Sequence, residues 1–449
     1  MGLWPHLNLH LPAHGGGRGL APELGALLRC PPASWDLPEL PGFGGPLLPE
    51  GAVARSQQRS AALLGASHCW YGVNGASGLL QAALLALAPP GSRVLLPRNL
   101  HRSLLHACVL GQLEPLLYGL PFDGATGLWH PPRAAQLQQV IAAAQATGPV
   151  AAIALVSPTY QGISAALPEL VAVAHGAGLP VLVDGAHGTG QGIAAGADLE
   201  VLSLQKNAGG LAQSAALLAQ GSRFEPAALA RSLLWLQTSS PSALLLASCE
   251  AAIDHLVDAA GRHQRRQAVA TANQLRQRCR ALGLPLAASN DPLRLVLHTS
   301  AMGINGLEAD DWLLARGVIA ELPEPATLTF CLGLKPPWRL SWRLPRVLHQ
   351  LQGALGGPPL PPQEPPPLPL VAQLALPLGT AWRARSDSVP LGQAAGRIAA
   401  EPLCPYPPGI PLLVPGERID AARATWLQRQ QPLWPGQIAD TVRVVADQG

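Results

Sequence analysis

Short, wholly aliphatic runs alternate with longer Ala- and Leu-rich segments between about residues 61 and 220. Fully apolar strands separated by helices are typical of a parallel sheet that is covered on both faces. We therefore expect an α/β fold with a mostly parallel central sheet. The predicted strands are 93–96, 150–156, 181–183, 199–204 and 215–219, and the predicted helices are 77–88, 135–146 and 167–175.

The length of 449 residues predicts two or three domains. A Pro-rich stretch at 358–367 cannot carry a helix or a central strand, so it indicates a semi-rigid linker. Long helices at 242–282, and a strand, helix and strand at 293–297, 310–316 and 318–322, indicate a smaller α/β unit. The predicted division is an N-terminal arm (1–60), a large α/β domain (61–240), a helical connection with a small α/β domain (241–355), a linker (356–369) and a C-terminal domain (370–449).

Charge and cysteine content exclude several classes of partner. The 30 basic and 27 acidic residues give a net charge of +3 without a polybasic run, which predicts neither a nucleic-acid nor a membrane partner. The seven cysteines lie far apart with no C-x-x-C pair, as in reduced intracellular proteins without a disulfide framework or metal site. No secretory signal pattern begins the chain, and glutamines and a proline interrupt the uncharged stretch 134–168. We expect a cytoplasmic protein.

Two side chains with complementary chemistry stand at the ends of predicted strands. Asp184 directly follows the strand 181–183, and Lys206 follows the strand that ends at 204. Ligands of open parallel sheets bind beyond such carboxyl ends. A lysine that forms a Schiff base and a carboxylate that keeps a pyridine nitrogen protonated are what pyridoxal phosphate (PLP) requires. Apolar surroundings would also lower the pKa of the lysine. On these residues alone, a capping aspartate and a loop cation remain an alternative.

Two further features suit the same cofactor. The segment Asn74–Gly78 precedes a predicted helix, and small residues at a helix N-terminus form an anion cradle. A simple N-cap by Ser77 is the alternative. His101 follows the strand 93–96 and a short loop, where it could lie flat over a cofactor ring, although a lone histidine is more often structural.

Taken in order, the motifs of this chain resemble the Orn/Lys/Arg decarboxylase family in its shorter bacterial form. These are PLP enzymes with the aspartate-aminotransferase fold, and the resemblance covers nearly the whole chain. It rests on Leu11–Gly15, Asp36–Leu40, Asn74–Ser77, Pro97–Ser103, Ser157–Gly162, Val183–Gly188, Ser203–Lys206, Gln237–Pro241, Tyr406–Pro411 and Pro415–Glu417.

The resemblance implies a role for each matching residue. Lys206 would be the Schiff-base lysine, Asp184 the partner of the pyridine nitrogen and His101 the side chain stacked on the ring. Ser203, Ser77 and the amides around Ala76 would hold the phosphate, and His187 would support the same site. Thr238 and Ser239 would approach the phosphate, in some enzymes of this fold from a second subunit, which implies a homodimer or higher homo-oligomer.

The implied reaction is decarboxylation of a basic amino acid to an amine of polyamine biosynthesis. Arginine, lysine and ornithine all suit this reaction. Each carries a distal cation that needs an acidic or carbonyl partner, for which Glu321 and Glu324 are candidates.

Departures from the family pattern motivate other hypotheses. Gln205 stands where the family usually has His, Gly185 where it usually has Glu, and Ala76 where a hydroxyl residue is common. A non-catalytic homologue with a regulatory or assembly role is one alternative, and another PLP reaction, such as transamination, is a second.

Two unrelated enzyme classes are disfavoured. The G-x-G-x-x-A pattern at 190–195 starts six residues after Asp184 and has no acid at the spacing of a nicotinamide site. The segment 75–79 lacks the final glycine of a serine-hydrolase elbow.

Overall fold

The computed structural model describes residues 7–37, 40–405 and 409–446. Its largest sheet has eight strands in the order β15-β4-β3-β7-β8-β9-β10-β2. The strands β4, β3, β7, β8 and β9 are parallel, whereas β10 is antiparallel to both of its neighbours and β15 is antiparallel to β4. The mostly parallel sheet is therefore confirmed. The strands are β2 (His68–Gly72), β3 (Arg93–Pro97), β4 (Glu114–Tyr118), β7 (Ala152–Val156), β8 (Val181–Asp184), β9 (Leu199–Ser203), β10 (Ala215–Ala219) and β15 (Val371–Ala372).

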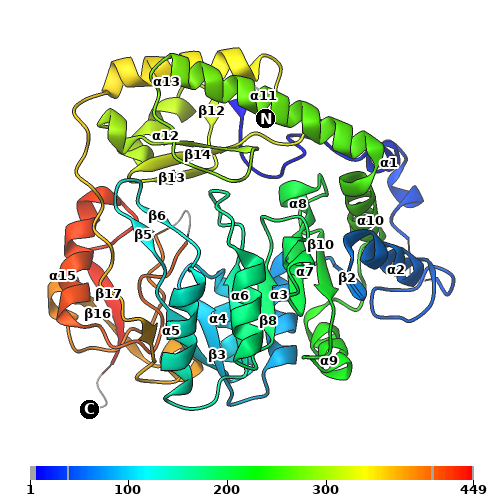
Figure 1. Cartoon of the computed structure of the whole chain (residues 1–449), viewed down its shortest axis with the longest axis horizontal. Helices are drawn as coiled ribbons and strands as arrows, with labels where there is room; N and C mark the ends of the chain where they lie inside the picture. Colours follow the sequence, from blue (N-terminus) through cyan, green and yellow to red (C-terminus); the bar gives the residue numbers. More distant parts are fainter. Residues whose placement is uncertain (1–6, 38–39, 406–408, 447–449) are drawn as a thin grey trace.

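Helices cover both faces of this sheet (Figure 1). Successive strand side chains point to opposite faces, so Val94 and Leu96 of β3 join one core while Leu95 joins the other. The first core holds α3 (Gly75–Leu87), α4 (Arg102–Leu110) and α9 (Pro226–Leu236), and the second holds α5 (Ala134–Gln145) and α6 (Leu167–Gly176). The N-terminal part of the chain forms α1 (Pro22–Leu27), the 3-10 turn η1 (Pro32–Ser34) and α2 (Ala52–Leu64).

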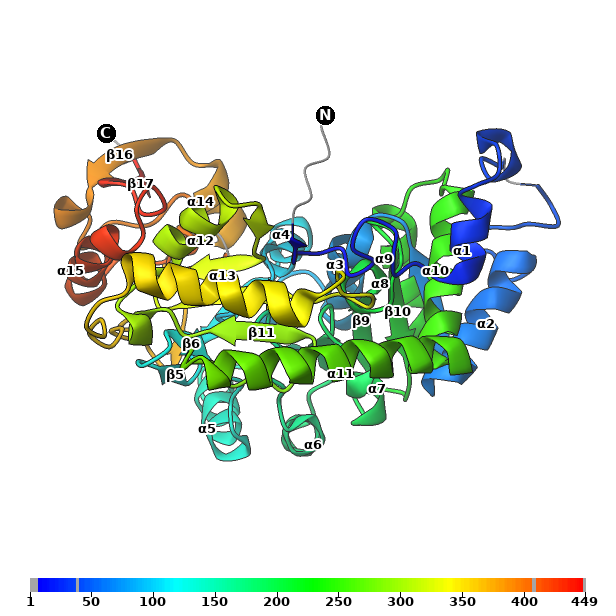
Figure 2. The same cartoon turned by 90° about the horizontal axis from the view of Figure 1, so that it is seen from above.

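A smaller α/β unit follows the large sheet. Its sheet has the order β11-β14-β13, and Figures 1 and 2 show α11 and α13 side by side over it. Its elements are α10 (Ala243–Val257), α11 (Ala259–Ala281), β11 (Arg294–Leu297), η2 (Ser300–Met302), α12 (Gly306–Leu314), β12 (Val318–Ile319), β13 (Leu322–Glu324), β14 (Thr327–Cys331) and α13 (Leu340–Leu355).

Two predicted elements of this unit need correction. The helix expected at 310–316 begins at Gly306, because the Asn305 side chain accepts a hydrogen bond from the Leu307 N–H and caps it there. The single strand expected at 318–322 is two strands. Val318 and Ile319 pair with β1 (Leu7–Asn8), whereas β13 pairs with β14, so different partners divide the run.

The last part of the chain forms its own core. It holds residues of η3 (Leu391–Gln393), α15 (Ala421–Gln430) and β17 (Thr441–Val445). The other elements here are α14 (Leu378–Arg383), β16 (Ser386–Pro390) and η4 (Gln431–Leu433). The Pro-rich linker carries no helix or strand, as expected, and runs from α13 down to this part (Figure 1). Within the described residues, no helix is long and apolar enough to cross a membrane.

Candidate active site

A cavity of about 470 Å³ lies at the carboxyl ends of the parallel strands. Asp184 is the last residue of β8, and Lys206 lies in α8 (Leu204–Asn207), the short helix that follows β9. Both side chains line the cavity. The two residues on which the cofactor hypothesis depends are thus on the same side of the sheet. Ala76, Ser77, His101, His187, Ser203 and Gln205 line it as well.

The Lys206 amine has a histidine neighbour. Its Nζ lies 2.9 Å from His187 Nε2, and His187 Nδ1 lies 3.4 Å from Arg294 Nη2. A guanidinium can only donate, so Nδ1 accepts and the imidazole proton belongs on Nε2. That proton can then be donated to the lone pair of a neutral Lys206 amine.

The electrostatics of the site favour this neutral arrangement. Burial lowers the pKa of Lys206, and Arg294 lowers it further, although Asp184 acts in the opposite direction. Burial, with Lys206 and Arg294 nearby, holds the pKa of His187 well below its usual value. The lowered lysine pKa was predicted from the apolar sequence, and a neutral amine is the nucleophilic form.

Asp184 is buried, and its Oδ1 accepts a hydrogen bond of 3.1 Å from the Ala186 N–H. That bond is a local cap of the kind the alternative reading proposed. The carboxylate nevertheless also lines the cavity, so the cap does not remove it from the site.

The N-terminus of α3 opens on the same cavity. The N-cap position is Asn74, so the alternative in which Ser77 is the N-cap is wrong, and Ser77 lies within the first helical turn. Asn74 does not cap the helix with its side chain but donates Nδ2 to the Leu236 carbonyl at 3.0 Å. The first-turn amides around Ala76 therefore remain uncapped by any described side chain and can bind an anion.

His101 occupies the N-cap position of α4. Its Nδ1 accepts from the Ser103 N–H at 3.3 Å and lies 2.8 Å from Ser103 Oγ. These bonds fix the ring orientation at the cavity wall. Burial lowers the pKa of His101, opposed by Asp184 and reinforced by Lys206.

Thr238 and Ser239 are not among the residues that line this cavity. Both are exposed, just beyond the C-terminal end of α9. The hydrogen bond from Asn74 to Leu236 nevertheless places their segment beside the start of α3.

The structure adds residues that sequence reasoning did not select. Tyr160 lines the cavity, contacts His187 with 4.4 Å between ring centroids and the rings tilted by 47°, and donates its hydroxyl to Glu321. Arg294 reaches His187 from β11 of the small unit, and no local motif marked it. Trp129 and Ile410 complete the wall from two other parts of the chain.

The two acids considered for a distal cation differ in their surroundings. Glu321 accepts from Tyr160 and from the Leu11 N–H, the latter at 2.6 Å. Glu324 is buried and accepts at Oε2 from Gln161 Nε2 at 2.8 Å and from Thr327 Oγ1 at 3.3 Å.

The unusual Gly185 is explained by a neighbouring strand. A Cβ at position 185 would lie 2.5 Å from Oε1 of Glu200, a buried residue of β9. The Glu200 carboxylate thus fills the space that a side chain at position 185 would need, and its Oε2 accepts from the Ile193 N–H at 2.8 Å.

The residues present suit PLP. A lysine amine, a buried carboxylate, a histidine ring and an uncapped helix N-terminus all face one cavity. Asn99 is at the same wall, and its buried Oδ1 has no hydrogen-bond partner in the described chain. No metal-ligating cluster of His, Cys, Asp or Glu occurs in the described ranges.

Comparison with known families identifies the chain. The model of the Orn/Lys/Arg decarboxylase major domain matches residues 7–292, and that of the C-terminal domain matches residues 377–432. The chain belongs to the Orn/Lys/Arg decarboxylase family. Family membership places it among the decarboxylases, as the sequence motifs predicted. Two of the sequence motifs include residues that lie outside the described ranges. These are Pro38 and Glu39 in one motif and Tyr406–Pro408 in the other.

Relatives and solved structures agree with this assignment. Arginine decarboxylases of Bacillus subtilis and of Halalkalibacterium halodurans are each 28% identical to the chain, over 94% of this chain and 90% of the relative. Lysine decarboxylase A from Pseudomonas aeruginosa superposes with a TM-score of 0.77 at 18% identity, covering 99% of this chain and 78% of that chain. A PLP-bound SPT structure, at 19% identity, has a TM-score of 0.53 over 68% of this chain and 77% of that chain. These likenesses confirm the expected PLP-dependent transferase fold.

Proposed function

We propose that this family member decarboxylates a basic amino acid with PLP attached through Lys206. The observation that carries the proposal is the meeting of Lys206, Asp184 and His101 at one cavity beyond the parallel strands. The arginine and lysine decarboxylases among its relatives support a basic substrate.

Different side chains would bind different parts of the cofactor. Asp184 would keep the pyridine nitrogen protonated, and His101, fixed by Ser103, would cover the ring. Ser77, Ser203 and the amides around Ala76 would bind the phosphate. When bound, PLP supplies the electron sink for the charge that remains when carbon dioxide leaves.

We propose that His187 controls the protonation and position of the Lys206 amine through a hydrogen bond. The 2.9 Å contact lets the imidazole donate to the neutral amine when the lysine is free, so the amine stays positioned during turnover. Arg294 keeps the imidazole in that tautomer from the opposite nitrogen.

The proposal includes the assembly and the compartment. We propose a cytoplasmic homodimer in which Thr238 and Ser239, outside the cavity of their own chain, approach the phosphate site of the partner. The predicted domain boundaries at 60, 240, 355 and 369 are part of the same proposal.

Purification with added PLP tests the function directly. The protein should show the visible absorbance band of a lysine-bound cofactor, and Lys206→Ala should lose it. Carbon dioxide release with arginine, lysine or ornithine is the expected activity. A protein that binds PLP and releases no carbon dioxide from any of the three would be a non-catalytic homologue, and a keto-acid product would indicate transamination.

A further inference from the structure

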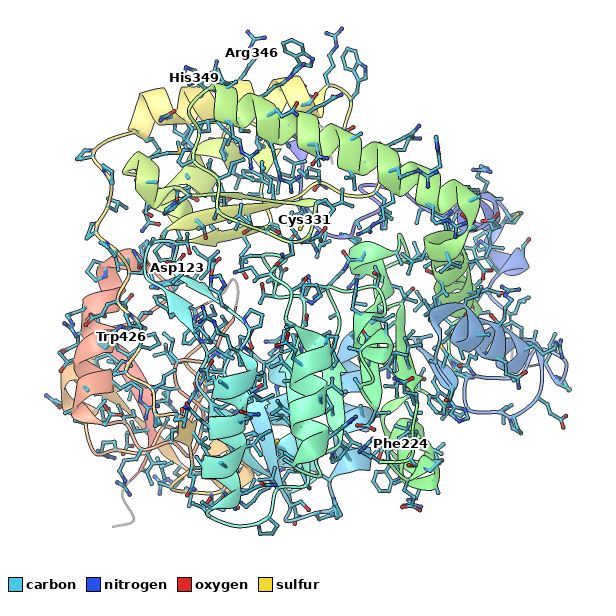
Figure 3. The ribbon with its side chains drawn as sticks, viewed as in Figure 1. Asp123, Phe224, Cys331, Arg346, His349 and Trp426 are labelled. Carbon is cyan, nitrogen blue, oxygen red and sulfur yellow. The ribbon has the colours of Figure 1, made fainter. Side chains whose placement is uncertain are left out.

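A second, smaller cavity adjoins the active site. Its volume is about 60 Å³, and four separate segments enclose it: the β5–β6 hairpin (Phe122–Asp123, Leu128–Trp129), the turn after β13, the linker and the C-terminal domain. We call it the aromatic cavity. Figure 3 shows Asp123 on the hairpin and Trp426 on α15, on the side where the linker descends. Its wall includes Phe122, Trp129, Glu324, Gln363, Trp426 and Trp434.

The aromatic cavity and the candidate active site share part of their walls. Trp129 and Ile410 line both cavities. Gln161 lines the active-site cavity and donates Nε2 to Glu324, which lines the aromatic cavity. Through Gln161, the Glu324 carboxylate is therefore one hydrogen bond away from a residue of the active-site wall.

The chemistry of the wall suits a cation. Glu324 is buried, forms no ion pair with any described Arg, Lys or His, and has only the neutral donors Gln161 and Thr327. Burial raises its pKa to about 7, opposed only by the hydrogen bonds from Gln161 and Thr327. The other acid at the wall, Glu364, is already paired with Arg429 at 3.0 Å.

The aromatic side chains favour one type of cation. Indole faces attract cations, and a planar guanidinium stacks on them while its fork of donors binds a carboxylate. Trp426 is held in place because its Nε1 donates to the Glu364 carbonyl at 3.1 Å. A fixed aromatic wall suits a flat group better than a compact ammonium ion.

We propose that the aromatic cavity binds the distal guanidinium of the substrate, with Glu324 as its counter-ion, so that arginine is preferred over lysine and ornithine. This inference rests on the proposed decarboxylase function and specifies which basic amino acid is its substrate.

Binding of butylguanidinium to the PLP-loaded protein, measured by calorimetry, tests the inference without turnover. Wild type should bind butylguanidinium and should bind butylurea, a neutral molecule of similar shape, much more weakly. Glu324→Gln should weaken butylguanidinium binding about tenfold to a hundredfold, because a charge-assisted hydrogen bond is lost. Trp434→Leu should weaken it about fivefold. Glu308→Gln, an exposed acid on α12 of the same unit, is the matched control and should change it by less than about twofold.

Equal affinity of wild type for butylguanidinium and butylurea would overturn the inference, and so would unchanged binding in Glu324→Gln. If Glu324→Gln does not fold, the inference is still tested by the wild-type affinities for butylguanidinium and butylurea and by the affinity of Trp434→Leu for butylguanidinium. Decarboxylation assays separate the two proposals. Carbon dioxide release with no preference for arginine contradicts only the aromatic cavity, whereas Glu324-dependent butylguanidinium binding without carbon dioxide release contradicts only the decarboxylase function.

Discussion

At the scale of single residues, the site depends on buried polar groups whose partners come from distant segments. Gly185 and Glu200 show this most clearly. A glycine in place of the usual glutamate looks like a loss when the sequence is considered alone. In the structure, the missing side chain leaves room for a carboxylate from the next strand. The two positions therefore have to be considered as a pair.

Gly185→Ala should destabilise the protein by about 1–3 kcal/mol, because its Cβ would lie 2.5 Å from Glu200 Oε1 in a packed interior. Chemical denaturation measures the change in the free energy of unfolding. Gly176→Ala is the matched control, since nothing lies within 4 Å of its added Cβ, and it should be close to neutral. Equal effects of the two substitutions would refute the close contact with Glu200.

The raised pKa of Glu324 predicts that the stability of the folded protein depends on pH. Its pKa is raised from 4.5 to about 7 in the folded protein, so the fold favours the protonated acid, and stability falls as the pH rises through that interval. Glu324→Gln removes this titration. At about pH 8 without ligand, the variant should be more stable than wild type by up to about 3 kcal/mol, and the difference should shrink near pH 4. Thermal unfolding at both pH values checks this, and a constant difference would contradict it.

At the scale of elements, the sheet and its helix termini create the site. Five parallel strands end at the same edge, which brings Asp184 and Lys206 into one cavity. The helix α3 then presents its uncapped N-terminus there. The strand β10 is as apolar as the five parallel strands of the sheet, yet it runs antiparallel to both of its neighbours, because a strand's direction depends on its connections and not on its composition.

Ser77→Ala should raise the dissociation constant for PLP about tenfold, because it removes one donor to a charged phosphate at the start of α3. Fluorescence titration of the cofactor-free protein with PLP measures this value. Ser67→Ala, at an exposed position before β2, is the control and should leave the constant unchanged. An unaltered constant in Ser77→Ala would place the phosphate elsewhere.

At the scale of the whole molecule, the C-terminal domain is joined to the large sheet by a buried ion pair. Arg98, directly after β3, donates to both oxygens of Glu417, at 2.7 and 3.0 Å, and Arg423 lies 3.1 Å from the same carboxylate. Burial raises the pKa of Glu417, but Arg98 and Arg423 outweigh it and hold that pKa below its usual value. Because Arg98 precedes His101 in one loop, this domain contact also supports the cavity.

Glu417→Ala should destabilise the protein by roughly 3–5 kcal/mol, since Arg98 would remain buried without its counter-charge. Limited proteolysis should then cleave the linker 356–369 faster than in wild type. Glu401→Ala removes an exposed acid 3.7 Å from Arg443 and should cost less than about 1 kcal/mol. Similar cleavage rates in the two variants would show that the ion pair does not hold the domains together.

The amino-acid sequence by itself determined the α/β class and most of the element positions, and it singled out Lys206, Asp184 and His101, which line one cavity, because apolar periodicity and short motifs are local properties of a chain. Only the tertiary structure decided that Arg294 orders His187, that Glu200 occupies the space at Gly185 and that Trp129 and Ile410 join two cavities. These residues come from separate strands, a hairpin and the C-terminal domain. Their proximity results from long-range packing, which leaves no periodic or spacing signal in the sequence.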